Sequence, residues 1–302
     1  MTNSPKPNPR RNLSLLSPAA LQNRPVSPAW LSLRPAPEPI GGGTLQGAAN
    51  FRAVLPYEAA NGRRLRPGLI YRSGELSSLT RTDLDHIAAS NIKLICDLRS
   101  RSEQIRFATQ WPKLQAARTL TMPETDSQNA GIEILISALA KSPGPEGARV
   151  AMLKTYARMP ETYAPLLRVL FSELQTGWGI PLLIHCHAGK DRTGFAVAML
   201  LAALGVSQAD ILDDYARTNQ FFDMAGETSI ITKIIGRALG TNPDPATAKP
   251  LAAADPAYLA SALAAIETRH GSIDAYLTTM LNLTPPARSR LHTLFLTTAQ
   301  TI

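Results

Sequence analysis

One short stretch of the chain gathers an unusual set of reactive and charged side chains. Residues 181–200 read PLLIHCHAGKDRTGFAVAML, in which an apolar run enters a polar loop, Cys186 to Arg192, and an apolar helical pattern follows Gly194. A loop between a strand and a helix N-terminus surrounds one point with backbone N–H groups and with the positive end of the helix dipole. The stretch therefore predicts a binding site for a tetrahedral oxyanion.

The side chains of this loop suit phosphate and attack on phosphorus. Gly189 lets the backbone turn closely because it has no Cβ, and the guanidinium of Arg192 can bind two phosphate oxygens at once. The same positive surroundings favour the ionised sulfur of Cys186, which is then a nucleophile at neutral pH. A cysteine facing a bound phosphate suits in-line attack and a phosphocysteine intermediate, and Thr193 is placed to hydrogen-bond the sulfur as it leaves.

The residues of the loop follow the pattern H-C-x-x-G-x-x-R-[ST], which is the signature of cysteine-dependent phosphatases. It is formed here by His185, Cys186, Gly189, Arg192 and Thr193. The predicted strand before the loop and helix after it supply the context that such a motif requires. A chance buried cysteine at a strand-to-helix turn is therefore disfavoured. Sulfur transfer of the rhodanese type is also disfavoured, because its loop differs in length and composition.

Three apolar segments that end in polar residues are predicted to be strands, and helical patterns alternate with them. They are GLIYRSG (68–74), IKLICDLRS (92–100) and PLLIHC (181–186). This alternation indicates an α/β domain with a central, mostly parallel sheet flanked by helices. The active site of such a domain lies at the carboxyl ends of the strands. Asp97 and Arg99, which end the second strand, are therefore expected in the same crevice as the loop.

The helix predicted after the first strand has clear local signals. In LTRTDLDHIAAS, Thr80 can cap the helix with Asp83 at the capping-box position, and Leu84, Ile87 and Ala88 form the expected buried stripe. Further helices are predicted over 160–177 and 193–204, and from Asp255-Pro256, Ser272 and Thr284-Pro285 in the tail. These additional C-terminal helices, within 219–283, are candidates for a lid or a membrane-facing surface.

The composition is that of a globular protein with a moderate basic excess. The 302 residues are 44% hydrophobic and 18% charged, with a net charge of +8. Half of this excess lies within residues 1–40, so the rest carries too weak a bias to indicate nucleic-acid binding, although it favours anionic substrates. No apolar run reaches the length of a membrane span. The two cysteines suit a reducing compartment, so we expect a cytoplasmic location, with a non-standard export route left open.

The N-terminal part of the chain differs in composition from the rest. Residues 1–43 hold nine of the 24 prolines and end in three consecutive glycines. Such a segment cannot bury enough apolar surface to fold by itself. We therefore predict a disordered leader over 1–43 and a single phosphatase domain over 44–302.

The loop HCHAGKDRTG resembles that of the bacterial atypical tyrosine and lipid phosphatases. The resemblance extends to NFRAV near residue 50, with Ala53 where that family usually has aspartate, and covers most of 50–296. The other matching segments are GLIYRSGELSSLTRTDL, ICDLRSRSE, YARMPETYAPLLRVLF, DDYARTN and YLASALAAIETRHGSIDAYLTTML. The resemblance implies a cysteine-phosphatase fold. It also implies the activity of a protein-tyrosine-phosphatase, which is a phosphoric monoester hydrolase. Neither a metal nor another cofactor is expected.

The leaving oxygen needs a proton donor, and several aspartates are candidates. The resemblance implies that Asp191, inside the loop, takes part in catalysis. The cations beside it favour the ionised carboxylate, whereas a bound phosphate dianion favours the protonated one. Asp97 is the second candidate, although it can instead pair with Arg192 or Arg99, and Asp126 is a weaker third.

The remaining residues near the loop bear on substrate binding and support. Lys190 adds a cation beside the phosphate, as in relatives of broad specificity, unless it is a solvated surface lysine. His187 and Ala188 are expected to contact substrate with Gly189 and Lys190, although His187 can equally face solvent. His185 is expected to orient the loop through ring hydrogen bonds. Arg72 and Arg99 either line the crevice or form structural ion pairs.

The sequence leaves open which substrate is physiological. Phosphotyrosine proteins are the first expectation, with phosphoserine and phosphothreonine as further substrates, and phosphoinositides or inositol phosphates are the alternative. A catalytically inactive phosphoprotein-binding module is disfavoured because Cys186, Asp191 and Arg192 are all present. Cys96 is expected to be an ordinary buried cysteine, although a reversible disulfide with Cys186 would protect the nucleophile from over-oxidation.

Overall fold

The central sheet confirms the prediction of a mostly parallel α/β architecture. The computed structural model describes residues 45–113, 115–122, 130–221, 223–240 and 242–297, so the predicted leader lies outside the described residues. The strands are β1 Arg52–Ala53, β2 Ile70–Ser73, β3 Leu94–Asp97, β4 Arg118–Thr121 and β5 Leu182–His185. Their order is β1-β2-β5-β3-β4, in which β1 is antiparallel to β2 and the other pairs are parallel.

The strands that carry the site are central and fully buried. All four residues of β2, β3 and β5 are buried, which agrees with their nearly continuous apolar sequences. The strand β4 was not predicted from the sequence. In this edge strand only Leu120 is buried, so its sequence lacks the apolar run that marks the other three.

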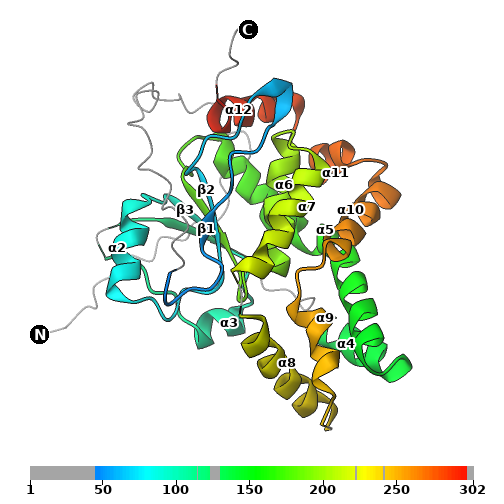
Figure 1. Ribbon diagram of the computed structural model, residues 1–302. Coiled ribbons are helices and arrows are strands. Elements are labelled where there is room, and N and C mark those ends of the chain that lie inside the picture. Colours follow the sequence, from blue (N-terminus) through cyan, green and yellow to red (C-terminus); the bar gives the residue numbers. More distant parts are fainter. Residues whose placement is uncertain (1–44, 114, 123–129, 222, 241, 298–302) are drawn as a thin grey trace, which may run out of the picture. The chain divides into compact units, whose positions relative to one another are not determined.

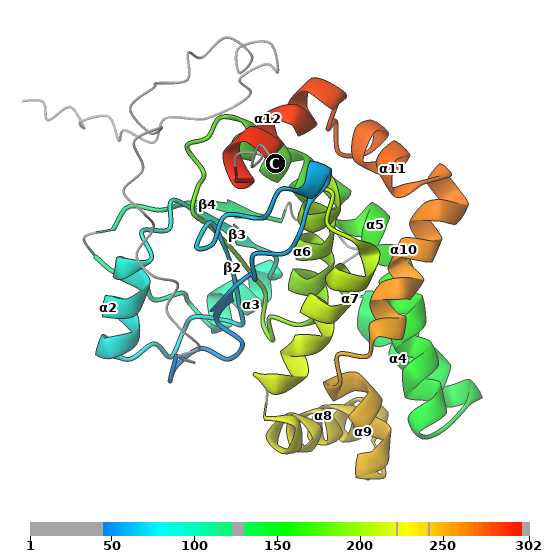
Figure 2. The same cartoon turned by 45° about the horizontal axis from the view of Figure 1, so that its top comes forward.

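Helices cover both faces of the sheet. They are α2 Arg81–Ala89, α3 Arg101–Arg106, α4 Ala130–Lys141, α5 Pro145–Gln175, α6 Asp191–Ala203, α7 Gln208–Ala216, α8 Met224–Leu239, α9 Pro245–Ala252, α10 Pro256–His270, α11 Ile273–Thr279 and α12 Pro285–Phe295. Short 3-10 turns lie at Ala60–Gly62 and Arg217–Gln220. Both ribbon views show α2 on one side of the strands and α5, α6 and α7 on the other (Figures 1 and 2).

The helix that follows the loop is the centre of the larger core. In α6, residues Thr193 to Leu201 are all buried, which confirms the prediction of a helix that is apolar nearly all round. It packs against β5 and β2 on one side and against α5, α7 and α10 on the other. The first turn of α6 is thereby fixed in position, and the loop before it shares that rigidity.

The predicted helix starts in the tail are confirmed. Asp255 and Thr284 cap α10 and α12, each followed by proline, and Ser272 caps α11 after Gly271 ends α10. The helix predicted over 160–177 begins earlier, at Pro145, because α5 continues through Pro160.

The C-terminal helices do not form one separate layer. The helix α10 packs along α5, and α12 also contacts α5, so these helices belong to the main body of the fold. The helices α8 and α9 pack on each other, and α9 contacts α5. Among the described residues, no helix is both long enough and apolar enough to cross a membrane.

The capping box of α2 is present as predicted, but its buried stripe is narrower than expected. Asp83 and Ile87 are buried, whereas Leu84 is half-buried and Ala88 is exposed. The reason is that Asp83 faces the segment before β1. Its carboxylate accepts hydrogen bonds from the backbone N–H groups of Gln46 and Gly47 in that segment, and from the N–H of Thr80 at the start of α2. The buried face of α2 is therefore turned toward Asp83 and Ile87 and away from Ala88.

This buried carboxylate generates a prediction about stability. Burial alone would raise the pKa of Asp83, but the backbone hydrogen bonds outweigh it and lower that pKa. Its contribution to the free energy of unfolding is therefore complete above the unfolded-state pKa of about 4 and is lost as the pH falls through the lower folded-state value. We expect Asp83→Asn to lower the free energy of unfolding at pH 7 by about 1–3 kcal/mol, measured by urea denaturation.

The control for this variant changes the aspartate two residues further along the same helix. Asp85 makes only an exposed ion pair with Arg81, so Asp85→Asn should change the free energy of unfolding by less than about 0.5 kcal/mol. Equal losses for the two variants would contradict the role given to the hydrogen bonds of Asp83.

Candidate active site

The polar loop forms a tight turn directly after β5. The Sγ atom of Cys186 accepts a hydrogen bond of 3.2 Å from the backbone N–H of Gly189, so the sulfur faces the inside of the loop. Cys186 is buried, and the loop ends in the first turn of α6 at Asp191. The predicted strand, anion loop and helix are therefore present in the predicted order; the name anion loop is used below for residues 186–192.

Gly189 is required by both its backbone conformation and its surroundings. Its φ is +68°, in the left-handed region. A Cβ at this position would lie 2.4 Å from the carbonyl carbon of Ser73 on β2. The loop can approach β2 this closely only with glycine.

Two side chains, one from the turn before β1 and one from β2, hold the anion loop in place. The carbonyl oxygen of Gly189 accepts hydrogen bonds from Asn50 Nδ2 at 2.6 Å and from Arg72 Nη2 at 3.1 Å. Because this carbonyl points outward, the N–H groups of the turn are left for the inside of the loop. The backbone N–H of Glu75 also donates to the carbonyl of His187 at 2.8 Å.

Arg72 belongs to a buried ion pair beneath the anion loop. Its Nη1 lies 2.6 Å from Asp214 Oδ2 on α7, and its Nη2 donates to Thr218 Oγ1 at 3.2 Å. The side chain is fully buried. Of the two roles that the sequence left open for Arg72, the structure therefore supports the structural ion pair.

Asp97 and Arg99 form a second buried ion pair. Arg99 Nε and Nη2 donate to the two carboxylate oxygens of Asp97 at 2.9 and 2.8 Å, and the backbone N–H of Arg99 adds a third bond at 3.0 Å. Arg99 also donates to the carbonyl of Phe107. Both oxygens of Asp97 are thus engaged, which favours its structural role over proton transfer. The third candidate donor, Asp126, lies outside the described residues.

The predicted role of His185 in orienting the loop stays a prediction. Its ring is fully buried, and neither ring nitrogen has a partner with hydrogen-bond geometry among the described residues, although the backbone of Cys186 acts to raise its pKa. The contact with Asp97 Oδ1, at 3.7 Å, is too long for one. Burial lowers the pKa of His185, although the charge of Asp97 acts in the opposite direction. The imidazole is therefore a neutral, packed group in this structure, because Arg99 already occupies the carboxylate that it would need.

Arg192 is held by a carboxylate that the sequence analysis did not identify. Its Nη1 and Nη2 donate to the two oxygens of Glu103 on α3 at 2.7 and 2.8 Å, and Nη1 also reaches the carbonyl of Leu98 at 3.3 Å. Burial alone would raise the pKa of Glu103, but these bonds lower it to about 2. Burial likewise opposes the charge of Arg192, yet Cys186 and Glu103 raise its pKa. The guanidinium therefore stays charged beside the sulfur.

Asp191 lies in a chain of hydrogen bonds that ends in two buried tyrosines. Its Oδ1 accepts from Tyr156 on α5 at 2.6 Å and from Lys190 Nζ at 2.5 Å. The hydroxyl of Tyr156 also lies 2.6 Å from that of Tyr215 on α7. Burial and the charge of Asp191 raise the pKa of Tyr156 well above its ordinary value. Tyr156 therefore remains a hydroxyl donor to the carboxylate.

Lys190 is not the solvated surface residue that the sequence left as an alternative. It is buried, and its ammonium also donates to the carbonyl of Ala253 after α9 at 3.3 Å.

Thr193 makes no hydrogen bond with the sulfur of Cys186. It is fully buried in the first turn of α6, and its Oγ1 has no partner among the described residues. The contact predicted between Thr193 and the leaving sulfur belongs to the phosphoenzyme, so it stays a prediction.

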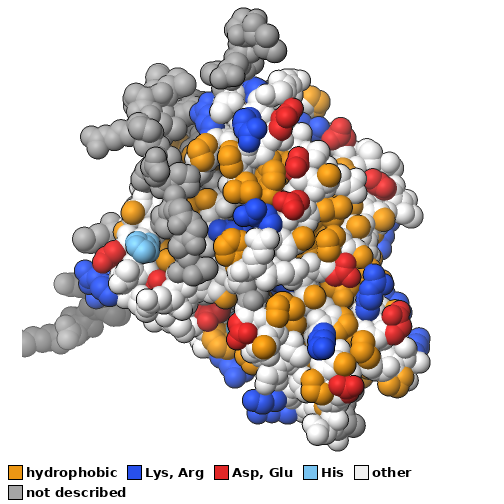
Figure 3. Space-filling view, in the orientation of Figure 1, with side chains coloured by type: hydrophobic (Ala, Val, Ile, Leu, Met, Phe, Trp, Pro, Cys, Tyr) orange, Lys and Arg blue, Asp and Glu red, His pale blue; other side chains and the backbone are white. Residues whose placement is uncertain are grey.

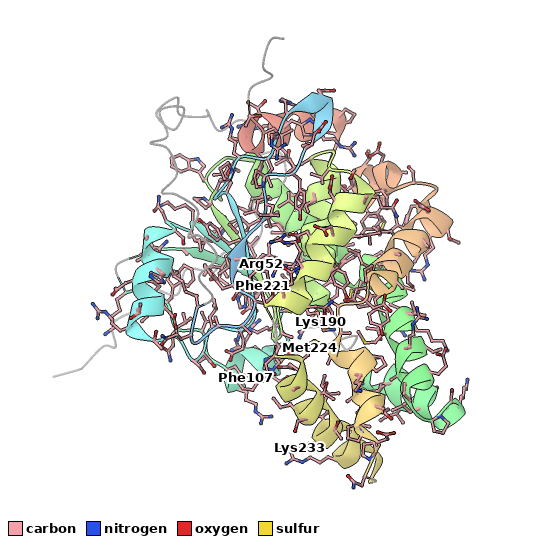
Figure 4. All side chains as sticks on the ribbon, viewed as in Figure 1. Arg52, Phe107, Lys190, Phe221, Met224 and Lys233 are labelled. Carbon is pink, nitrogen blue, oxygen red and sulfur yellow. The ribbon has the colours of Figure 1, made fainter. Side chains whose placement is uncertain are left out.

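The entrance of the anion loop is flanked by aromatic side chains. His187 is exposed, and its ring centroid lies 4.8 Å from that of Phe107 after α3. Ala188 is half-buried. Figure 4 places Phe107 and Phe221 on separate segments around the position of Lys190, and the ring of Phe221 lies under the guanidinium of Arg52.

Cys96 is buried on β3 and remains a free thiol, as does Cys186. In the sheet register Cys96 lies opposite Ile184, two residues before Cys186. Burial raises the pKa of Cys96, so that its thiol stays protonated. These observations agree with the ordinary buried cysteine that we expected.

No group of three or more His, Cys, Asp or Glu side chains that could hold a metal ion occurs among the residues that the model describes. At the anion loop the structure places one thiol, two bonded carboxylate–cation pairs and the backbone N–H groups of the loop itself.

Comparison with known proteins identifies the family. The model of a tyrosine phosphatase family matches residues 43–297. A Cupriavidus necator protein whose name describes it as a candidate tyrosine-protein phosphatase is 33% identical over 76% of this chain and 80% of its own. The triple specificity protein phosphatase PtpB of Mycobacterium tuberculosis is 29% identical over 77% of this chain and 91% of its own. Pseudomonas aeruginosa TpbA, a solved structure, covers 68% of this chain and 96% of its own at 15% identity, with a TM-score of 0.29.

The chain belongs to this tyrosine phosphatase family, whose members are phosphoric monoester hydrolases. The expectation drawn from the loop and the flanking motifs is therefore confirmed at the level of family and enzyme class.

The close approach of Gly189 to β2 can be tested against a matched glycine. Gly62 has nearly the same φ of +65°, but a Cβ there would meet nothing within 4 Å. We expect Gly62→Ala to cost about 1 kcal/mol of unfolding free energy from backbone strain. Gly189→Ala should cost at least about 2 kcal/mol more, because the Cβ overlaps the backbone of β2. Urea denaturation measures both, and similar losses would show that the loop is free to move away from β2.

Proposed function

We propose that the chain hydrolyses phosphotyrosine in proteins through a phosphocysteine intermediate on Cys186. The observation that carries the proposal is the arrangement of three groups in one turn. The sulfur faces the N–H of Gly189, Arg192 is held charged by Glu103, and the loop carbonyl is turned outward by Asn50 and Arg72. A phosphoryl group bound by the N–H groups and by Arg192 would face the sulfur.

In the first chemical step, the ionised Cys186 attacks phosphorus and the S–P bond forms as the P–O bond to the tyrosine oxygen breaks. The loop N–H groups and Arg192 stabilise the charge on the three remaining oxygens. Asp191, protonated when the phosphate dianion is bound, gives its proton to the departing oxygen. Tyrosine is released, and the phosphoryl group stays on sulfur.

In the second step, water attacks the phosphocysteine. Asp191, now a carboxylate, takes a proton from the water as the S–P bond breaks and phosphate leaves. Thr193 Oγ1 is buried without a partner next to the loop, and we infer that it donates to the sulfur at this stage. In this proposal Thr193 therefore acts during hydrolysis of the phosphoenzyme.

The hydrogen bonds of Asp191 assign different tasks to its two oxygens. Tyr156 and Lys190 both donate to Oδ1, so we infer that Oδ2 carries the transferred proton. Tyr156 is a positioning residue in this account, because it acts through Asp191. Asp97 supports the site by holding Arg99, and both of its oxygens are engaged there rather than in proton transfer.

The burial of Cys186 favours phosphotyrosine, because a phenyl spacer reaches a recessed sulfur more easily than a serine methylene. The name of PtpB describes triple specificity, which supports phosphoserine and phosphothreonine as further substrates here. Phosphoinositides remain the second candidate, supported by the cations Lys190 and Arg52 close to the loop. A cytoplasmic location also belongs to this proposal, because both cysteines are free thiols.

The nucleophile is tested by Cys186→Ser with p-nitrophenyl phosphate. The hydroxyl is far less ionised than the thiol, so we expect turnover to fall by at least about a thousandfold, while phosphate or vanadate binding is retained. Cys96→Ser is the control and should leave turnover within about twofold of wild type, since Cys96 lies outside the loop. Activity that survives in Cys186→Ser would refute the proposed mechanism.

The role of Tyr156 is tested by the dependence of kcat/KM on the leaving group, because kcat/KM reports the first chemical step without hydrolysis of the phosphoenzyme. Asp191→Asn should lower kcat/KM by about 10²–10⁴-fold with phenyl phosphate and by much less with p-nitrophenyl phosphate, which needs little protonation. Tyr156→Phe should show the same pattern at about tenfold, the cost of one hydrogen bond.

Tyr276→Phe is the matched control for Tyr156→Phe. Tyr276 is buried, and its hydroxyl also bonds to α5, at the carbonyl of Pro160, but it does not touch Asp191. Its removal should affect stability without a leaving-group trend. If Tyr156→Phe lowers kcat/KM equally for both substrates, the positioning role is wrong.

A further inference from the structure

One face of α8 is exposed although it carries two large apolar side chains. Ile230, Lys233, Ile234 and Arg237 are spaced by three, one and three residues, so they form a continuous stripe on one side of the helix. Both isoleucines are 52% exposed, and both cations are exposed. Ile235, on the opposite side, is buried and fixes α8 to its neighbours. The name α8 stripe is used below for these four residues.

The charge of the α8 stripe indicates what could cover it. The stripe holds two cations and no acid, and the single acidic residue of α8 is Glu227 near its start. Glu227 is half-buried, and this burial raises the pKa of its carboxyl group although the charges of His187 and Lys190 act in the opposite direction. An exposed helix face with isoleucine and basic side chains in alternation is typical of helices that lie in the interface of an anionic bilayer.

The position of α8 relative to the anion loop gives this face a function. The helix lies close to the loop, because α8 packs on α9 and the carbonyl of Ala253, directly after α9, accepts a hydrogen bond from Lys190. Figure 4 shows Lys190, Met224 and Lys233 in succession from the loop outward along α8, with Lys233 at the outer margin. The space-filling view shows apolar and basic surface together in the region of α8 (Figure 3). A surface bound to the α8 stripe would therefore lie close to the entrance of the site.

The helix on the other side of His187 has the same chemical character. Phe107, which ends α3, packs on His187, and the preceding Ile105 is 68% exposed. Arg101 and Arg106 of α3 are exposed as well. The two helices that border the exposed histidine of the loop thus both present isoleucine together with basic side chains.

We propose that the α8 stripe docks the protein on anionic lipid bilayers. Ile230 and Ile234 enter the boundary between headgroups and acyl chains, and Lys233 and Arg237 lie against the anionic headgroups. The docked protein has the anion loop next to the bilayer surface, so its substrates are phosphate esters at that surface. The inference goes beyond the proposed chemistry, because binding to the bilayer requires no turnover.

The experiment is co-sedimentation of the full chain with vesicles of phosphatidylcholine alone or with added phosphatidylserine. We expect binding to the phosphatidylserine vesicles, weakening as salt is added, and little binding to phosphatidylcholine alone. The double variants Ile230→Asn/Ile234→Asn and Lys233→Glu/Arg237→Glu should each weaken binding by at least about tenfold, since each changes two contacts of the bilayer.

The controls change equally exposed residues elsewhere on the surface. Val169→Asn removes an apolar side chain that is 46% exposed on α5, and Arg81→Glu with Lys93→Glu reverses two exposed cations at and after α2. These variants should bind the vesicles as wild type does. Turnover of p-nitrophenyl phosphate should be unchanged in every variant, which verifies that each one is folded.

Three results would overturn the docking proposal. They are absence of binding to phosphatidylserine vesicles, equal losses in the α8 and control variants, and a fall in the molar mass in solution caused by the α8 variants, which would assign this face to a second copy of the chain. If vesicle binding follows the α8 stripe but p-nitrophenyl phosphate is not hydrolysed, the proposed function fails while the docking surface stands.

Discussion

The outward orientation of the Gly189 carbonyl is the constraint on which the site depends. Asn50, in the turn before β1, and Arg72, on β2, donate to this oxygen. With the carbonyl held outside, the N–H of Gly189 points to the sulfur of Cys186. The left-handed φ of Gly189 and the close backbone of β2 permit no other residue at this position. The anion-binding geometry is therefore built before any ligand arrives, so little reorganisation is needed when one binds.

The charges around the loop are arranged so that the cations stay in place. Arg192, Arg72 and Lys190 are paired with Glu103, Asp214 and Asp191, respectively. Each carboxylate fixes a cation that would otherwise be mobile or costly to bury. Two of these acids come from helices that are remote in sequence, which ties the loop to α3 and α7. The chemistry of the loop is thus supported by the packing of the whole domain rather than by the loop alone.

Local sequence patterns predicted the central strands, the first helix and the loop motif. They did not predict contacts between residues that are far apart in the sequence. The apolar runs of β2, β3 and β5, the capping box of α2 and the motif from His185 to Thr193 are contiguous signals, and the structure contains them all. Glu103 lies 89 residues from Arg192, and Asn50 lies 139 residues from Gly189. Tyr156 carries no local signal for its contact with Asp191. The ring hydrogen bonds expected of His185 are also not formed with a described residue, because spacing along a chain does not show which neighbour has already taken an acceptor.

The central chemical claim, a covalent phosphoryl group on sulfur, is tested most directly by rapid acid quench of the protein mixed with a phosphotyrosine peptide. Mass spectrometry of the digested protein then locates any phosphoryl group. The account predicts a phosphorylated peptide that contains Cys186, formed before phosphate is released and absent in Cys186→Ser. Release of phosphate with no phosphoryl group on that peptide at any time, or with one on another residue, would contradict it.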